Sequence, residues 1–131
     1  MRRGGVTTVH DPRTPLGMHT FRLGEAIVDV YVLRPGTNAI DVDVSIYEPG
    51  GPRVTVLDFS VSVFDSAGHE LRQTKGPPGQ LARASLGGDP SAHGWFSFEA
   101  LKHGRTLERV RVFLRGATEE VSVTALRSFQ A

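Results

Sequence analysis

Strict alternation of apolar and polar residues is the feature that most constrains the fold of this chain. Within residues 40–47 the apolar positions are Ile40, Val42, Val44 and Ile46, and polar or amphipathic residues stand between them. Because successive side chains of a β-strand point to opposite sides, this pattern places all four apolar side chains on one face. The polar opposite face indicates an antiparallel strand with one side in the core and the other in water.

The same period of two recurs in residues 28–32, 59–63 and 110–114, and a returning strand is expected to bury Val121, Val123 and Ala125. Fifteen Gly and eight Pro supply turn residues between such segments. No segment keeps the i, i+3, i+4, i+7 apolar spacing of an amphipathic helix over several turns. The chain is therefore expected to contain many strands and little helix.

Short strands separated by frequent turns predict an all-β fold. We expect an immunoglobulin- or fibronectin-like antiparallel β-sandwich of about seven to nine strands, with a small closed barrel as the alternative. The 131 residues suffice for one such domain. Residues 1–18 have little apolar periodicity and are predicted to form a flexible N-terminal segment, which leaves residues 19–131 as a single sandwich domain.

Composition excludes several classes of function. The chain has no Cys, which rules out a disulfide frame, a thiolate metal site and a cysteine nucleophile. Lys and Arg number 15 against 14 Asp and Glu, so a net charge of +1 creates no general attraction to nucleic acid. Polar residues interrupt each apolar run early, so no membrane-inserted segment is expected.

Histidine and methionine supply the candidate metal ligands. His10, Met18 and His19 lie in or beside the N-terminal segment, and a thioether with two imidazoles suits copper(I). The alternative is a segment that contains these residues without a built site. A second candidate places the imidazole of His69 with the carboxylate of Asp65, which precedes a tight turn ending at Gly68.

Asp41 and Asp43 project from the same face of one strand. Their carboxylates are separated by a distance that acid/base catalysis can use. The favoured interpretation is a solvated face on which Arg109 and Arg111 pair with them across strands. No Gly-x-Ser-x-Gly motif or Ser–His–Asp order suggests a nucleophile. No catalytic residue is therefore predicted.

Surface binding has two candidate sites. Arg109, Arg111 and Arg115 form a basic stripe that can hold an anion or a partner's acidic edge, although exposed Arg also protects sheets from edge pairing. Trp95 precedes Phe96 and Phe98, which are expected in the core with Trp95 covering its rim. A carbohydrate or peptide platform requires Trp95 to be exposed instead.

Two resemblances bear on function. Leu23-Gly24-Glu25, Arg34 to Asn38 and Gly51-Pro52 make residues 23–129 similar to the soluble Ig-like tail domain of bacterial CopD-type copper-resistance proteins, related to YtkA-like β-sandwiches. Asp65 to Gly68 and Gly94 to Glu99 resemble small secreted Ig-like antigens and lipoproteins of actinobacteria. Both resemblances imply the sandwich fold and an extracytoplasmic setting, and neither implies catalysis or carries over a functional residue.

These observations favour a non-enzymatic, extracytoplasmic binding or accessory module. Such a module would be associated with copper handling through a membrane-protein neighbour. Copper is the only candidate cofactor. A cytoplasmic location is the alternative if no signal or anchor preceded the chain. The alternative functions are a small barrel enzyme or ligand-binding protein with an interior pocket, and a protein-interaction module that uses an exposed edge strand.

Overall fold

The computed structural model describes residues 14–34, 39–48, 58–77, 82–83 and 91–127. These residues form nine β-strands and one short 3₁₀ turn. The strands are β1 (Thr14–Leu23), β2 (Ala26–Arg34), β3 (Ile40–Tyr47), β4 (Phe59–Asp65), β5 (Gln73–Lys75), β6 (Ala82–Arg83), β7 (Ser91–Phe98), β8 (Leu107–Leu114) and β9 (Ala117–Ser122), and the 3₁₀ turn is η1 (Val123–Ala125).

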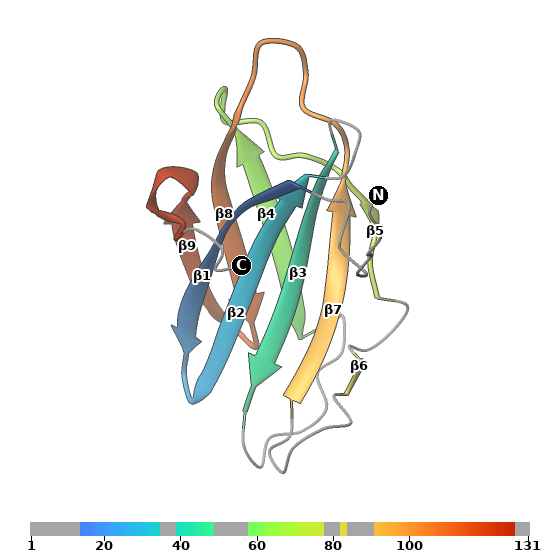
Figure 1. The fold of residues 1–131 in the computed structure, drawn as a ribbon. Helices are drawn as coiled ribbons and strands as arrows, with labels where there is room; N and C mark the ends of the chain where they lie inside the picture. Colours follow the sequence, from blue (N-terminus) through green and yellow to red (C-terminus); the bar gives the residue numbers. More distant parts are fainter. Residues whose placement is uncertain (1–13, 35–38, 49–57, 78–81, 84–90, 128–131) are drawn as a thin grey trace, which may run out of the picture.

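The strands form two antiparallel sheets that lie face to face (Figure 1). The larger sheet has six strands in the order β1-β2-β3-β7-β5, and β6 also pairs with β7. The smaller sheet has the order β4-β8-β9. Two separate layers packed in this way are a sandwich and not a closed barrel.

The backbone conformation of two residues explains the tight connection between β8 and β9. Leu114 pairs with Ala117, so Arg115 and Gly116 make a two-residue hairpin loop. Both residues have positive φ, at 47° and 92°. That backbone conformation matches the right-handed twist of a hairpin and is easy for Gly, which has no Cβ.

The core lies between the two sheets and consists of the inward-facing residues of their strands. Its largest fully buried side chains are Phe59, Phe98, Ile40, Ile46 and seven valines. Phe96 and Phe98 are both buried, as the sequence predicted. The expectation that Trp95 covers the rim of the core was wrong, because Trp95 points to the outer face of the sheet and is 60% exposed. The inward sets predicted for residues 28–32, 40–46, 59–63 and 110–114 are also buried. The all-β sandwich is thus confirmed.

The structure differs from the prediction at both ends of the described chain. Strand β1 begins at Thr14, so residues 14–18 of the predicted N-terminal segment pair with β2. The returning strand β9 ends at Ser122, and Val123 and Ala125 belong to η1 instead of the predicted strand. Beyond η1, Met18 and Arg127 exchange two backbone hydrogen bonds of 2.9 Å, which attach the C-terminal segment to β1.

Helical structure is scarce in the described part of the chain. None of its helical segments has the length and apolar character needed to cross a membrane.

Candidate functional site

A row of side chains crosses the outer face of the six-stranded sheet, on the side away from the core. Tyr31 on β2 lies opposite Asp43 on β3, and Asp43 lies opposite Trp95 on β7. The neighbours Val30, Val32 and Phe96 point inward, so strand alternation directs this row outward. Since neighbouring strands lie about 4.8 Å apart, the backbones of Tyr31 and Trp95 are about 10 Å apart.

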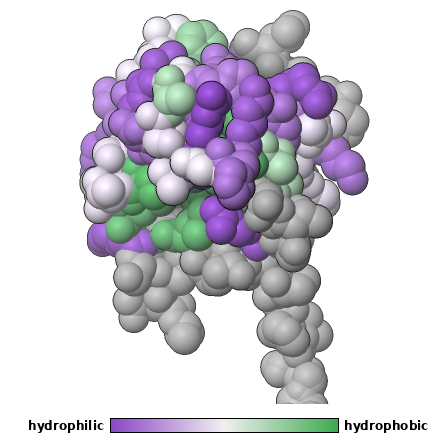
Figure 2. Space-filling view, turned by 90° about the horizontal axis from the view of Figure 1, so that it is seen from above, coloured by the Kyte–Doolittle hydropathy of each residue, from purple (hydrophilic) through white to green (hydrophobic). Residues whose placement is uncertain are grey.

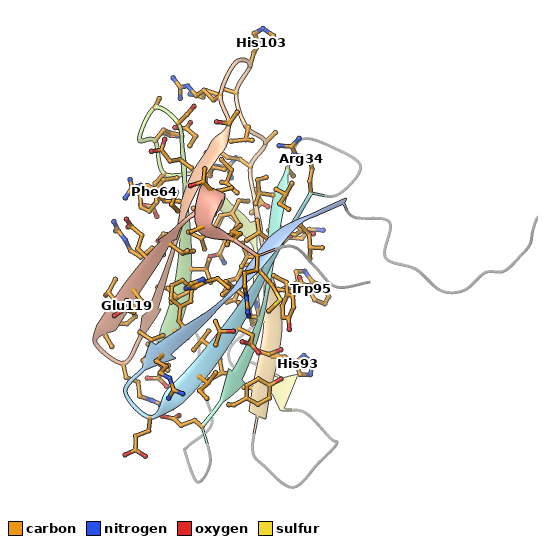
Figure 3. All side chains as sticks on the ribbon, turned by 60° about the vertical axis from the view of Figure 1, so that its left-hand side comes forward. Arg34, Phe64, His93, Trp95, His103 and Glu119 are labelled. Atoms are coloured by element: carbon orange, nitrogen blue, oxygen red, sulfur yellow. The ribbon has the colours of Figure 1, made fainter. Side chains whose placement is uncertain are left out.

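Exposure of aromatic rings is concentrated on this same face. Trp95 is 60% exposed and Tyr47 is 41% exposed, and these are the only large hydrophobic residues classed as exposed in the described chain. Tyr47 ends β3, four residues beyond Asp43 on the same face. Figure 3 shows Trp95 and His93 projecting from β7 away from the sheet that carries Phe64. We call the outer surface around Tyr31, Asp43, Tyr47, His93 and Trp95 the Trp95 face.

The next row along the Trp95 face is polar. Asp29 on β2 lies opposite Ser45 on β3, which lies opposite His93 on β7. On β1, the hydroxyl of Thr20 donates a hydrogen bond of 2.6 Å to Oδ1 of Asp29. Hydroxyl, carboxylate and imidazole groups therefore border the aromatic row.

Burial and then neighbouring groups favour the protonated form of the Tyr31 phenol. Burial, followed by the nearby Asp29 carboxylate and Tyr47, raises the pKa of Tyr31 above its usual value. Its O–H therefore remains a hydrogen-bond donor throughout the physiological pH range. Flat aromatic surface, fixed carboxylates and hydroxyl groups together suit non-covalent recognition of a ligand.

The predicted partners of the aspartates on β3 were wrong. Asp41 and Asp43 do share the outer face of the six-stranded sheet, and Asp41 is buried. Arg109 and Arg111 lie on β8 in the other sheet, facing away from the core. The whole sandwich separates the two sets, so they cannot form cross-strand ion pairs.

The basic stripe is divided into two separate networks. Arg109 and Arg111 both donate hydrogen bonds to Glu120 on β9, at 3.0 to 3.1 Å. Their guanidinium groups also cover the ring of Phe64, at 4.4 and 4.7 Å from its centroid. The hydrogen bonds from Arg109 and then Arg111 outweigh burial and lower the pKa of Glu120. Both cations are therefore already paired with one carboxylate, that of Glu120.

Arg115 does not join that network. It lies in the β8–β9 hairpin loop and donates a hydrogen bond of 2.6 Å to Oε1 of Glu48. The structure thus does not bring the three arginines together into one anion site.

The two candidate copper ligands in the described chain, Met18 and His19, are not brought together either. His10 lies outside the described residues. Met18 and His19 are successive residues of β1, so their side chains point to opposite faces of the sheet. His19 packs edge-on against Phe21, with ring centroids 4.6 Å apart. No group of three or more His, Asp or Glu in the described chain could hold a metal ion.

The candidate pair of His69 with Asp65 is not formed, because the Asp65 carboxylate is occupied by other partners. Its Oδ1 accepts the backbone N–H groups of Ala67 and His69, both at 2.9 Å. Its Oδ2 accepts a hydrogen bond from Arg105. The imidazole of His69 instead lies 3.4 Å from Oε2 of Glu99. The predicted turn itself is confirmed by the Gly68 N–H, which donates to the Asp65 carbonyl.

Another exposed surface lies at the upper end of the sandwich in Figure 1. Viewed from that end, its surface is mostly hydrophilic, with an apolar area that borders the grey residues (Figure 2). The structure does not describe those neighbouring residues, so no site is assigned there.

Tyr31, Asp29 and His93 were not identified from the sequence as binding candidates. One signal for Tyr31 was present, because it lies between the inward-facing Val30 and Val32 and must point outward. Its position beside Asp43 and Trp95 depends on how β2, β3 and β7 pair. That pairing is a property of the tertiary structure.

Comparisons of this chain with family models, with curated proteins and with solved structures found no match.

Proposed function

We propose that this chain is a non-enzymatic binding module with an immunoglobulin-like sandwich fold, acting outside the cytoplasm, which recognises its ligand on the Trp95 face. The single observation that carries the proposal is the placement of exposed aromatic surface. Trp95 and Tyr47 lie on the same face of one sheet, whereas the other large apolar side chains of the described residues are at least half-buried. Solvent-exposed Trp and Tyr on a rigid sheet are typical of recognition surfaces.

An interior catalytic site has less support. The space between the sheets is occupied by the apolar cluster that includes Phe59, Phe96 and Phe98. The described carboxylate with the most buried side chain, that of Asp65, is held by hydrogen bonds within a turn. Both observations favour a structural role for the interior and a binding role for the surface.

An edge-strand docking function has less support than the Trp95 face. Beyond β7 the sheet continues only with β5, of three residues, and β6, of two residues, in the described chain. Strand β9 exposes Glu119 and Glu120, and charged residues on an edge oppose pairing with a further strand.

Copper binding is not part of the proposal, because Met18 and His19 point to opposite faces.

The test is retention on immobilised probes of different chemistry. The probes are a neutral polysaccharide, a proline-rich peptide, a lysine-rich peptide and vesicles of anionic phospholipid. We expect the wild-type chain to be retained by at least one probe, and the double variant Trp95→Ala, Tyr47→Ala to pass through it. The matched control is Phe113→Ala, which removes a half-buried aromatic ring from the outer face of the other sheet.

Two results would overturn the proposal. One is that no probe retains the wild-type chain. The other is retention that the double variant keeps in full. Formation of new reducing ends on the polysaccharide would contradict the non-enzymatic part.

A further inference from the structure

The free edge of the six-stranded sheet at β1 is partly closed by the chain itself. We propose that the C-terminal segment, residues 123–127, is an autoinhibitory guard of this edge, and that its release lets β1 pair with β1 of a second copy of the chain. Such self-pairing is separate from ligand recognition on the Trp95 face, because it uses the backbone groups at the side of the sheet.

Strand β1 (Thr14–Leu23) is an edge strand that lies next to β9 at one side of the sandwich (Figure 1). Met18 directs both its N–H and its C=O away from β2, since both bond to Arg127. These directions alternate along an antiparallel ladder, so Thr20 and Arg22 direct theirs to the same side. No described residue pairs with either of them there. Such an edge is a template for a further strand.

The C-terminal segment is attached to this edge at one point. Its antiparallel bridge joins Met18 with Arg127 through two backbone hydrogen bonds of 2.9 Å. The preceding turn η1 has no side-chain cap hydrogen bond and no buried residue. Val123 and Leu126 are only partly buried against the core. A segment with so few bonds and buried groups opens at a lower free energy than a full ladder, so it can be released while β1 stays paired with β2.

The residues of β1 suit a two-fold pairing centred on Thr20. In that register Thr20 lies opposite its counterpart in the second copy, and Met18 lies opposite Arg22 on both sides of the centre. Of these three residues Arg22 alone is charged, so no like charges meet. On the other face of β1, His19 meets Phe21 of the second copy. Those two rings already pack edge-on within one chain, with centroids 4.6 Å apart.

The attached segment blocks most of this pairing. While Arg127 occupies the N–H and C=O of Met18, the two pairs that involve Met18 cannot form, and the Thr20 pair alone is left. Leu126 also lies close beside the strand, because a Cβ built on Gly17 would be 2.6 Å from its Cβ. One remaining pair of residues does not offset the freedom that two chains lose on association. The guard therefore opposes dimerisation through β1.

Substitution of Arg127 tests the guard in the full chain. Arg127→Pro removes the N–H that donates to the Met18 carbonyl, and the proline ring obstructs the bridge. Leu126 has φ of −69° and ψ of 141°, the extended conformation that a residue before proline prefers. The matched control is Arg127→Ala, which removes the same side chain and keeps the backbone N–H. Sedimentation of each protein from micromolar to millimolar concentration measures the dimer.

We expect the dimer of Arg127→Pro to have a dissociation constant at least about tenfold lower than that of Arg127→Ala, because the pairs that involve Met18 become available. In dilute Arg127→Pro, hydrogen exchange at the Met18 amide is expected to accelerate. The amides of His19 and Phe21, which face β2, should keep their wild-type protection. Adding Thr20→Pro removes the central N–H and should return the chain to a monomer, whereas adding Thr20→Ala should not.

Several results would overturn the guard. Equal association of Arg127→Pro and Arg127→Ala is one. Loss of protection at His19 and Phe21 is another, because the segment would then not separate from the strand. A dimer that persists after Thr20→Pro would place the contact on another surface. Gly17→Ala displaces the same segment from the β1 side and should give the same dimer, so a monomer with a fast-exchanging Met18 amide would also contradict the proposal.

Discussion

Asp65 organises the connection after β4 through its carboxylate. The side chain is fully buried, yet it accepts two backbone N–H groups and the guanidinium of Arg105, 40 residues away in sequence. Burial alone would raise the pKa of Asp65, but the hydrogen bonds from His69, Ala67 and Arg105 outweigh it and lower the pKa. The ionised form is therefore part of the folded structure.

This lowered pKa predicts a pH-dependent loss of stability. A carboxyl group whose pKa is depressed by folding stabilises the protein above its unfolded pKa, about 4, and this contribution disappears as pH falls through the folded value. We expect Asp65→Asn to be less stable than wild type at pH about 7. The difference should shrink as pH falls below about 4, because wild-type Asp65 then becomes neutral as well.

Urea denaturation of both proteins over this pH range measures the difference. Glu99 and Glu120 also have lowered pKa values, so both proteins lose stability in acid, and comparison with Asp65→Asn isolates the one carboxylate. Parallel stability curves down to pH about 2 would contradict the assignment.

At the scale of elements, the attachment of the C-terminal segment to β1 depends on Gly17. This residue has φ of 148° and lies at a register shift in the pairing of β1 with β2. A Cβ built there would be 2.6 Å from the Cβ of Leu126. Only a glycine lets the two segments approach closely enough for Met18 and Arg127 to form their paired hydrogen bonds.

Gly17→Ala is therefore expected to lower the free energy of unfolding by about 1–3 kcal/mol. It should also accelerate hydrogen exchange at the Met18 and Arg127 amides, because the C-terminal segment must move away from the new methyl group. The control is Gly24→Ala, where φ is also positive but no atom lies near the added Cβ. Equal exchange rates at both amides in wild type and Gly17→Ala would exclude the close approach.

At the scale of the whole molecule, the core and the proposed recognition surface lie on opposite sides of the same strand. On β7, Phe96 and Phe98 point into the core beside Phe59, whose ring centroid is 5.8 Å from that of Phe96. Trp95 points to the other side and is mostly exposed. The proposed binding surface therefore lies apart from the residues that hold the sheets together.

This separation predicts contrasting effects of two neighbouring substitutions. Phe98→Ala is expected to cost about 3–5 kcal/mol of unfolding free energy, because it leaves a cavity between the sheets. Trp95→Ala is expected to change stability by less than about 0.5 kcal/mol, because the ring is largely in water. Denaturant titration distinguishes the two, and a large loss in Trp95→Ala would assign Trp95 to the core.

Prediction from sequence succeeded where a local pattern decides the outcome. Alternation identified the buried faces of β2, β3 and β8, and Asp65 with Gly68 identified the tight turn. Prediction failed where the partner of a side chain depends on which strands are neighbours and which sheet they belong to. Arg109 pairs with Glu120 and not with Asp41 or Asp43, since the sandwich interior separates the two outer faces.

The sequence by itself determined that the chain forms antiparallel strands with one apolar face each, because the period of side chains along a strand is a local property. It did not determine which strands are neighbours. Tertiary pairing placed Tyr31, Asp43 and Trp95 in one row and turned Trp95 toward water while Phe96 entered the core. The physical reason is that register is decided by burying all the apolar faces at once, and the composition of the outer face follows from that packing.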